Sequence, residues 1–362
     1  MVVVSEAPSW RPPDRLLRWA AISLCALAIA GAAVAGALLL ARLRLVLVPV
    51  VVATFLTRAL AVPADALGRR GWPARRRASV VLLGFLAVLA AITWIVAPPL
   101  AAEVDDLGPT LQDGIDQVED WLVRDAPIDL DRQQLQDLED RAVDQLRSAA
   151  AGGGGIVERA QVALETVAGL VLALLLTLFA LKDGEQLQRW ALHRVPRHRR
   201  DEATRMAAAG WAALGGYLRG AALLGVVEAV IIGGTLAVVG SSLVLPVALL
   251  TFVGAFLPIV GATLAGAAAV LTALVTAGTA EAGIVLVVAV LVQQFDNDLL
   301  APWIYGRTLQ LHPAVILLSI TTGTALFGFA GAVLAVPVVA AVVGAVGARD
   351  PEGAEALSAD DP

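Results

Sequence analysis

Charged residues are scarce in this chain of 362 residues: 16% are Asp, Glu, Lys or Arg, whereas 58% are apolar. In a typical soluble domain, roughly a quarter of the residues are charged. The ranges 19–41, 229–280 and 308–348 contain no Asp, Glu, Lys or Arg at all. Roughly 20 apolar residues cross the bilayer core as a helix, and the backbone there finds no water to bond. The composition therefore predicts an integral membrane protein and argues against a soluble enzyme.

Cysteine and histidine are nearly absent as well. Cys25 is the single cysteine, which excludes a disulfide framework and a thiolate-bound metal. The three histidines, at 193, 198 and 312, do not form the H-E-x-x-H pattern of zinc hydrolases, and there is no G-x-x-x-x-G-K-[ST] loop for nucleotide phosphates. We therefore expect no enzyme, no metal site, no cofactor and no nucleic-acid partner.

The apolar runs are continuous, whereas the strands of a membrane barrel alternate in hydrophobicity. We therefore predict an all-α polytopic membrane protein with about eight hydrophobic segments. The first segment follows Arg11, Arg15 and Arg18 as a signal peptide would, but its length and the spans after it favour a retained anchor. The predicted segments are 19–41, 43–63, 78–100, 160–181, 220–240, 243–278, 282–301 and 310–346.

Basic residues indicate which side of the membrane each connection occupies. They gather before the first segment, in the loop 69–77 and in 182–219. Lys and Arg in short loops mark the cytoplasmic side, so we expect a multi-pass protein of the cell membrane with both termini inside. The predicted divisions are a cytoplasmic N-terminus (1–18), three spans (19–100), an external acidic insertion (101–159), a fourth span (160–181), basic cytoplasmic interfacial helices (182–219), a C-terminal membrane domain with broken helices (220–346) and a disordered acidic tail (347–362).

The insertion 101–159 holds 15 acidic residues against 5 arginines. Its apolar residues recur at helical spacing, from Leu107 to Leu122 and again from Leu135 to Leu146. We predict a pair of amphipathic helices, which bury too little to be stable alone and so need each other, a second subunit or the membrane domain. A solvated acidic hairpin and a vestibule that attracts cations are both open as its role.

Two apolar runs are too long for one span and too short for two. Leu243–Val275 would measure about 50 Å as a straight helix and Leu311–Val346 about 54 Å, against a core of about 30 Å. Paired Gly- and Pro-interrupted segments are typical of the substrate site of secondary transporters. They can also serve only to pack helices closely, and both runs are candidates for re-entrant hairpins. The broken-helix candidates here are Pro258, Gly261, Gly266, Gly323, Gly328, Gly331 and Pro337.

Charged residues inside the apolar segments are candidates for an ion pathway. Glu228 lies within a predicted span, where an isolated carboxylate is costly and must face the bundle interior or a wet cavity. It is either a proton carrier or a paired structural residue. Asp296, Asn297 and Asp298 end another span and either bind a cation or a polar substrate or anchor the helix end; Arg307 is a candidate ion-pair partner.

The stretch from Gln294 to Val339 resembles the autoinducer-2 exporter family of predicted permeases. The resemblance also covers the segment FLPIVGATLAG, although Ala262-Thr263 stands where relatives commonly have a proline, and the layout of three spans, an insertion and further spans. The family pattern has an Asn, a Pro and a Gly, then Leu-x-Pro, then a glycine series that ends in Pro; in this chain these are Asn297, Pro302, Gly306, Leu311, Pro313, Gly323, Gly328, Gly331 and Pro337, with Pro258 and Gly261 upstream.

The resemblance implies transport, with a signalling furanone as the named substrate, while some relatives are regarded as sodium/proton antiporters. The leading hypothesis is a secondary transporter that exports a small polar molecule of this kind, coupled to an ion gradient and assembled as a homo-oligomer in the bilayer. The first alternative is a cation/proton antiporter. The second alternative is a non-transporting membrane partner that acts through the acidic insertion.

Overall fold

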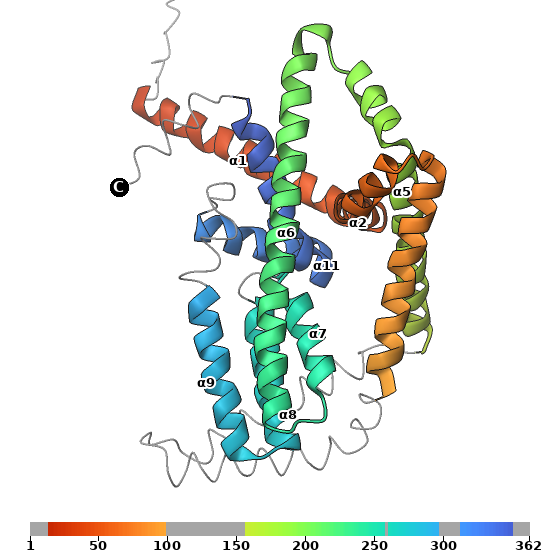
Figure 1. Ribbon diagram of the computed structural model, residues 1–362. Coiled ribbons are helices and arrows are strands. Elements are labelled where there is room, and N and C mark those ends of the chain that lie inside the picture. Colours follow the sequence, from red (N-terminus) through yellow and green to blue (C-terminus); the bar gives the residue numbers. More distant parts are fainter. Residues whose placement is uncertain (1–13, 99–155, 258–259, 297–311, 350–362) are drawn as a thin grey trace, which may run out of the picture.

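The computed structural model describes residues 14–98, 156–257, 260–296 and 312–349 (Figure 1). Every regular element in these ranges is a helix, which confirms the predicted all-α fold. The helices are α1 (Asp14–Arg42), α2 (Arg44–Arg69), an unlabelled helix (Ala74–Pro98), α5 (Ile156–His193), the short 3-10 helix η1 (Arg197–Arg199), α6 (Arg200–Val238), α7 (Val244–Gly254), α8 (Val260–Thr276), α9 (Thr279–Phe295) and α11 (Pro313–Gly347).

The outer surface of these helices is apolar. Trp94 is 83% exposed and Val238 is 88% exposed. Most of the described helices also carry exposed Leu, Ile or Val side chains. A soluble protein rarely exposes contiguous apolar surface on this scale, whereas lipid chains cover it at no cost. By length and composition alone, five of the described helices could cross a bilayer: Arg44–Arg69, Ala74–Pro98, Ala160–His193, Arg197–Val238 and Ala314–Gly347, although the last one is interrupted at Gly328. The polytopic membrane protein predicted from composition is therefore confirmed.

Three helices of the N-terminal half pack together on one side of the structure. The helix Ala74–Pro98 lies beside α2 and α5 (Figure 1). Arg58 of α2 then reaches across to α6, where its Nε donates to the carbonyl oxygen of Trp211 at 3.0 Å. Gly215 leaves the space that the guanidinium occupies, because a Cβ there would overlap it. The shared core of the three helices is Leu60, Ala64, Ala78, Val81, Leu82 and Leu181.

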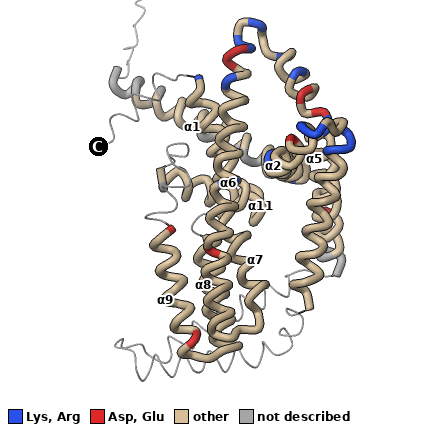
Figure 2. The backbone as a smooth tube through the Cα atoms, viewed as in Figure 1, with Lys and Arg blue, Asp and Glu red and all other residues tan. Residues whose placement is uncertain are grey.

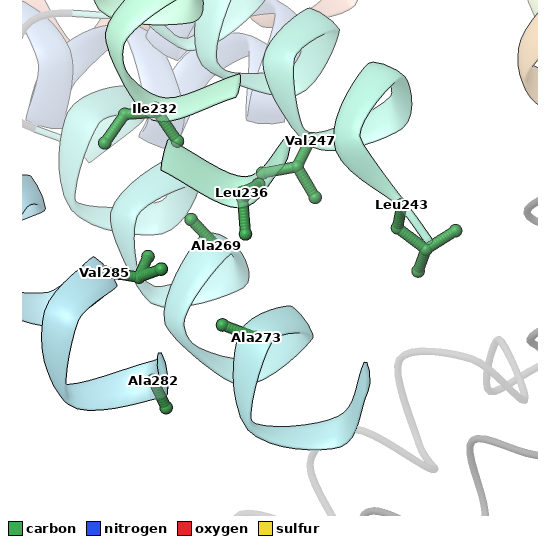
Figure 3. Close-up of a cluster of buried hydrophobic side chains, with 8 residues drawn as sticks. All are labelled: Ile232, Leu236, Leu243, Val247, Ala269, Ala273, Ala282 and Val285. Carbon is green, nitrogen blue, oxygen red and sulfur yellow. The ribbon is translucent and has the colours of Figure 1, made fainter. Parts of the chain in front are cut away.

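A second core lies between α6, α7, α8 and α9 (Figure 3). Three of its members, Ala269, Ala273 and Ala282, are alanines. Small side chains let helices approach closely in a bilayer, where dispersion contacts rather than the exclusion of water hold helices together. The core residues are Ile232, Leu236, Leu243, Val247, Ala269, Ala273, Ala282 and Val285.

The first over-long run folds into a helical hairpin made of α7 and α8. In one straight helix Gly254 and Gly261 would lie about 10 Å apart. Here a Cβ on Gly254 would come within 2.9 Å of the Gly261 carbonyl oxygen, and a Cβ on Gly261 would overlap the Gly254 carbonyl. The chain therefore doubles back between them, and both arms, of 11 and 17 residues, are shorter than the roughly 20 residues of a typical straight span.

The second over-long run folds back in the same way within α11. Gly328 has φ 62° and ψ −145°, a backbone conformation open to glycine and strongly disfavoured for other residues. Gly323 and Gly331, on either side, are so close that a Cβ on either would clash with the carbonyl of the other. The length of α11 is therefore divided between two arms. The question left open by the sequence, one long helix or a hairpin, is answered as a hairpin in both runs.

The basic segment 182–219 is divided between two long helices. α5 continues past a break at Asp183 to His193, and α6 runs without a break from Arg200 into the membrane. Pro196 stands between them, and its fixed φ and missing N–H suit the turn that separates two helices. Further along α6, the helix makes close contacts with α11: Gly210 lies against Ala341, and Ala213 lies against Gly344.

The contact at Gly261 predicts a specific loss of stability. Gly261→Ala should lower the unfolding free energy by about 1–3 kcal/mol, because the added methyl meets a backbone carbonyl that cannot move independently. Gly283→Ala is the matched control: this glycine is also helical, a Cβ there meets nothing within 4 Å, and alanine favours the helix. Thermal unfolding in detergent checks this, and equal melting temperatures for the two variants would contradict the hairpin contact.

Candidate functional site

Glu228 lies in the middle of α6 and is buried, with 4% of its surface exposed. Its neighbours on the helix are apolar, and the next acidic residue along the chain is Glu281. The carboxyl faces inward because outward rotation would place it against lipid, where insertion costs about 2.5–3.5 kcal/mol or more. The requirement derived from the sequence, that this group face the bundle interior, matches where the structure places it.

Asp296 is the C-cap residue of α9 and is also buried, with 7% of its surface exposed. Its backbone N–H bonds to the carbonyl oxygens of Gln293 and Val292, which holds it at the helix end. The carboxyl lies beside that of Glu228, 68 positions earlier in the chain. Its Oδ1 atom is buried and has no hydrogen-bond partner among the described residues.

A small cavity opens between these two carboxyl groups. The cavity has a volume of about 20 Å³, which is enough for one water molecule or one small ion. A metabolite does not fit this conformation. The cavity is lined by Glu228 and Ile232 from α6, Thr251 from α7, Ala262 and Gly266 from α8, and Ala289, Val292, Gln293 and Asp296 from α9.

The described walls of this cavity carry two acidic groups. Neither Lys nor Arg is among the described residues that line it. Two ionised carboxylates side by side repel strongly where the dielectric constant is low. The pair therefore favours binding a proton, a cation or both, and occupancy by one changes the affinity for the other. Two carboxyl groups fall short of the three ligating groups expected of a metal site, and no such cluster occurs in the described ranges.

The α7–α8 hairpin is attached to α6 beside this cavity. Tyr217 is buried, and its hydroxyl donates to the carbonyl oxygen of Phe256 at 2.9 Å, just past the end of α7. Phe256 also meets Phe252 edge to face, with ring centroids 5.7 Å apart. Gly225 lets the hairpin approach, since a Cβ there would come within 2.8 Å of the Phe252 carbonyl oxygen. The Tyr217 hydroxyl thus links α6 to the end of α7, the helix that contributes Thr251 to the cavity.

The other predicted site residues fall into three groups. Gly266 lines the cavity and Gly261 forms the close contact of the first hairpin. Gly323, Gly328, Gly331 and the buried Pro337 belong to the second hairpin, and Pro313 begins α11; none of these five lines the cavity. Outside the described residues lie Asn297, Asp298, Pro302, Gly306, Arg307 and Pro258.

Sequence reasoning missed Tyr217 and Thr251. Tyr217 is one of two tyrosines, and it stands just before a predicted apolar span, which was a usable signal for a residue with a structural partner. Thr251 gave no such signal, because its hydroxyl bonds to the Val247 carbonyl one turn back, as hydroxyls in apolar helices commonly do.

Comparison with known proteins adds independent information. The model of a family described as AI-2E family transporter matches residues 22–349. A candidate transport protein of Mycobacterium tuberculosis, MT0215, is 35% identical over 300 residues, which cover 83% of this chain and 82% of the relative. Two candidate transport proteins of Bacillus subtilis also match: YrrI is 25% identical over 91% of this chain and 94% of its own length, and YueF is 27% identical over 73% of each.

The Tyr217 contact predicts how firmly the cavity wall is held. On a Cys25→Ala background, Ala262→Cys reports access to the cavity. Tyr217→Phe removes one hydrogen bond worth about 1 kcal/mol and should raise the rate of maleimide labelling about five-fold in vesicles. Thr235→Val is the control, because its hydroxyl bonds only to the Ile231 carbonyl of the same helix. Unchanged labelling in Tyr217→Phe would show that this bond does not hold the hairpin.

Proposed function

The chain belongs to the AI-2E family of transporters, and on this premise we propose that it is a secondary transporter driven by an ion gradient. The proposed cargo is a small polar molecule of the autoinducer-2 type, moved outward across the cell membrane. Glu228 and Asp296 are the proposed binding site of the coupling ion. One observation carries this assignment: a buried carboxyl pair shares a water-sized cavity that contains no basic side chain among its described walls.

The two carboxyl groups suit ion coupling for a physical reason. A proton or a cation neutralises the pair, and the neutral site then resides in the membrane at far lower cost than the charged one. The α7–α8 hairpin contributes Thr251, Ala262 and Gly266 to the same cavity. A broken helical hairpin supports alternating access because its arms can shift without breaking the hydrogen bonds within them.

A cation/proton antiporter is the second candidate function. The size of the cavity favours it, since about 20 Å³ holds a dehydrated cation or a water but not a furanone. In this case the ion site itself is the cargo site.

The remaining proposals are assembly as a homo-oligomer with both termini in the cytoplasm, and a partner role for the acidic insertion 101–159, which lies outside the described residues.

Replacement of Glu228 tests the ion coupling. In proteoliposomes, cargo flux through the native chain should increase with an imposed pH or sodium gradient. Glu228→Gln should abolish that response, because the amide binds neither a proton nor a cation by charge. Glu281→Gln is the matched control, since Glu281 is an acidic residue at the opposite end of α9 and outside the cavity. Native flux that ignores both gradients would refute the coupled mechanism.

The same variant separates the two candidate functions. In everted vesicles, an antiporter should release sodium in response to a proton gradient, and Glu228→Gln should lose that release. If furanone export persists in the variant while sodium release disappears, the carboxyl pair serves cation exchange. If both activities disappear together, the pair couples the ion to the export of the organic cargo.

A further inference from the structure

The connection between α5 and α6 forms a basic projection, here called the elbow and defined as residues 184–205. It contains six arginines against three carboxylates. Residues 185–191, 193–194 and 196–199 are exposed, so the elbow packs against little else in the described part of the chain. Figure 2 shows arginines on both arms of the elbow, at the end of the structure beyond the core of α6–α9.

The elbow reaches well beyond the membrane. α6 has 39 residues and is about 58 Å long, whereas the bilayer core measures about 30 Å. Its apolar end, Val238, is 88% exposed and suits lipid. If α6 is tilted by as much as 40°, the helix still spans about 45 Å along the membrane normal. Arg200 therefore lies outside the hydrocarbon core and above much of the headgroup layer.

Two of the elbow arginines are held in place by local contacts, and no elbow arginine forms an ion pair with another described residue. The Arg200 guanidinium donates to the carbonyl oxygens of Val195 at 3.1 Å and His193 at 3.2 Å, which fixes the turn. Arg194 stacks on Trp190 with its Cζ 3.6 Å from the ring centroid. The ion pairs recorded between described residues join Arg44 to Glu165, Lys182 to Asp183 and Arg349 to Glu202, so none uses an elbow arginine.

A segment of opposite charge begins beside the elbow. The Nε of Arg349 lies 3.0 Å from Oε1 of Glu202, in the first turn of α6. The 13 residues that follow, 350–362, contain five carboxylates and no Lys or Arg. Thirteen residues span at most about 45 Å, so every arginine of the elbow is within their reach.

We propose that the acidic segment 350–362 docks on the arginines of the elbow within the same chain. The contact follows from opposite charge and from attachment: the ion pair of Arg349 with Glu202 starts the segment next to its binding surface, at a high effective concentration. Exposed ion pairs are individually weak and are screened by salt over about 8–10 Å at ordinary ionic strength. The docked state is therefore populated at low salt and released at high salt. The proposal is independent of the transported substrate.

Cross-linking in the full-length chain tests this docking. On a Cys25→Ala background, His198→Cys reports the apex of the elbow and Ser358→Cys reports the acidic segment. Ala208→Cys replaces His198→Cys in the control pair, since Ala208 is exposed on α6 and equally within reach, but is outside the elbow. At about 50 mM salt, a short bis-maleimide should link the elbow pair at least five-fold more than the control pair. At about 1 M salt the ratio should approach one.

Three further measurements test which partner occupies the elbow. Replacing Arg194, Arg197 and Arg199 by glutamine should abolish the preference while melting temperature stays unchanged. Equal yields for the two pairs at low salt, or a preference that survives 1 M salt, would overturn the proposal. It would also be overturned if the preference held in phosphatidylcholine nanodiscs but disappeared in phosphatidylglycerol nanodiscs, because lipid headgroups would then be the partner of the elbow. A link formed only between mixed singly substituted chains would assign the contact to neighbouring copies and overturn it likewise.

Discussion

A carboxyl group within a bilayer has no water to stabilise its charge, and the candidate site depends on this constraint. Glu228 and Asp296 are carboxylates within apolar helical segments, and both are buried, at 4% and 7% exposure. The two carboxyls line one cavity, and neither Lys nor Arg is among its described walls, so a bound proton or cation would neutralise the pair. The helices around the cavity carry small residues, Ala262, Gly266 and Ala289, so that the space for such an ion remains open.

The same lack of water determines how the helices pack. Lipid chains are as apolar as leucine, so there is no gain from burying large side chains in preference to small ones. The closest contacts accordingly involve glycine and alanine: Gly254 with Gly261, Gly323 with Gly331, and Gly210 with Ala341. Large side chains such as Trp94 point outward instead. Close backbone contact then gives each hairpin its shape without a hydrophobic core of the kind found in a soluble protein.

Local composition was sufficient to predict the fold class, because a run without charge is informative by itself. It also identified the two runs that had to be interrupted, since their lengths fit neither one span nor two. The pairing of Glu228 with Asp296 was beyond reach: the sequence implies that each carboxyl is internal but not that they share one cavity across 68 positions. The bond from Tyr217 to Phe256, 39 positions away, was equally inaccessible, because its acceptor is a backbone carbonyl that every residue possesses. The single helix from Arg200 to Val238 was expected as separate interfacial and spanning pieces, since the change in polarity near Arg219 reads as a boundary although the backbone continues.

That unbroken helix has a mechanical consequence. Arg200 and Glu228 are 28 residues apart on one rod, which places them about 42 Å from each other. A tilt of 10° about Glu228 would swing Arg200 through about 7 Å, so small rotations deep in the bilayer become large displacements in the aqueous phase. Conversely, a force applied at Arg200 would be transmitted to the Glu228 carboxyl directly, because the helix between the two residues is continuous.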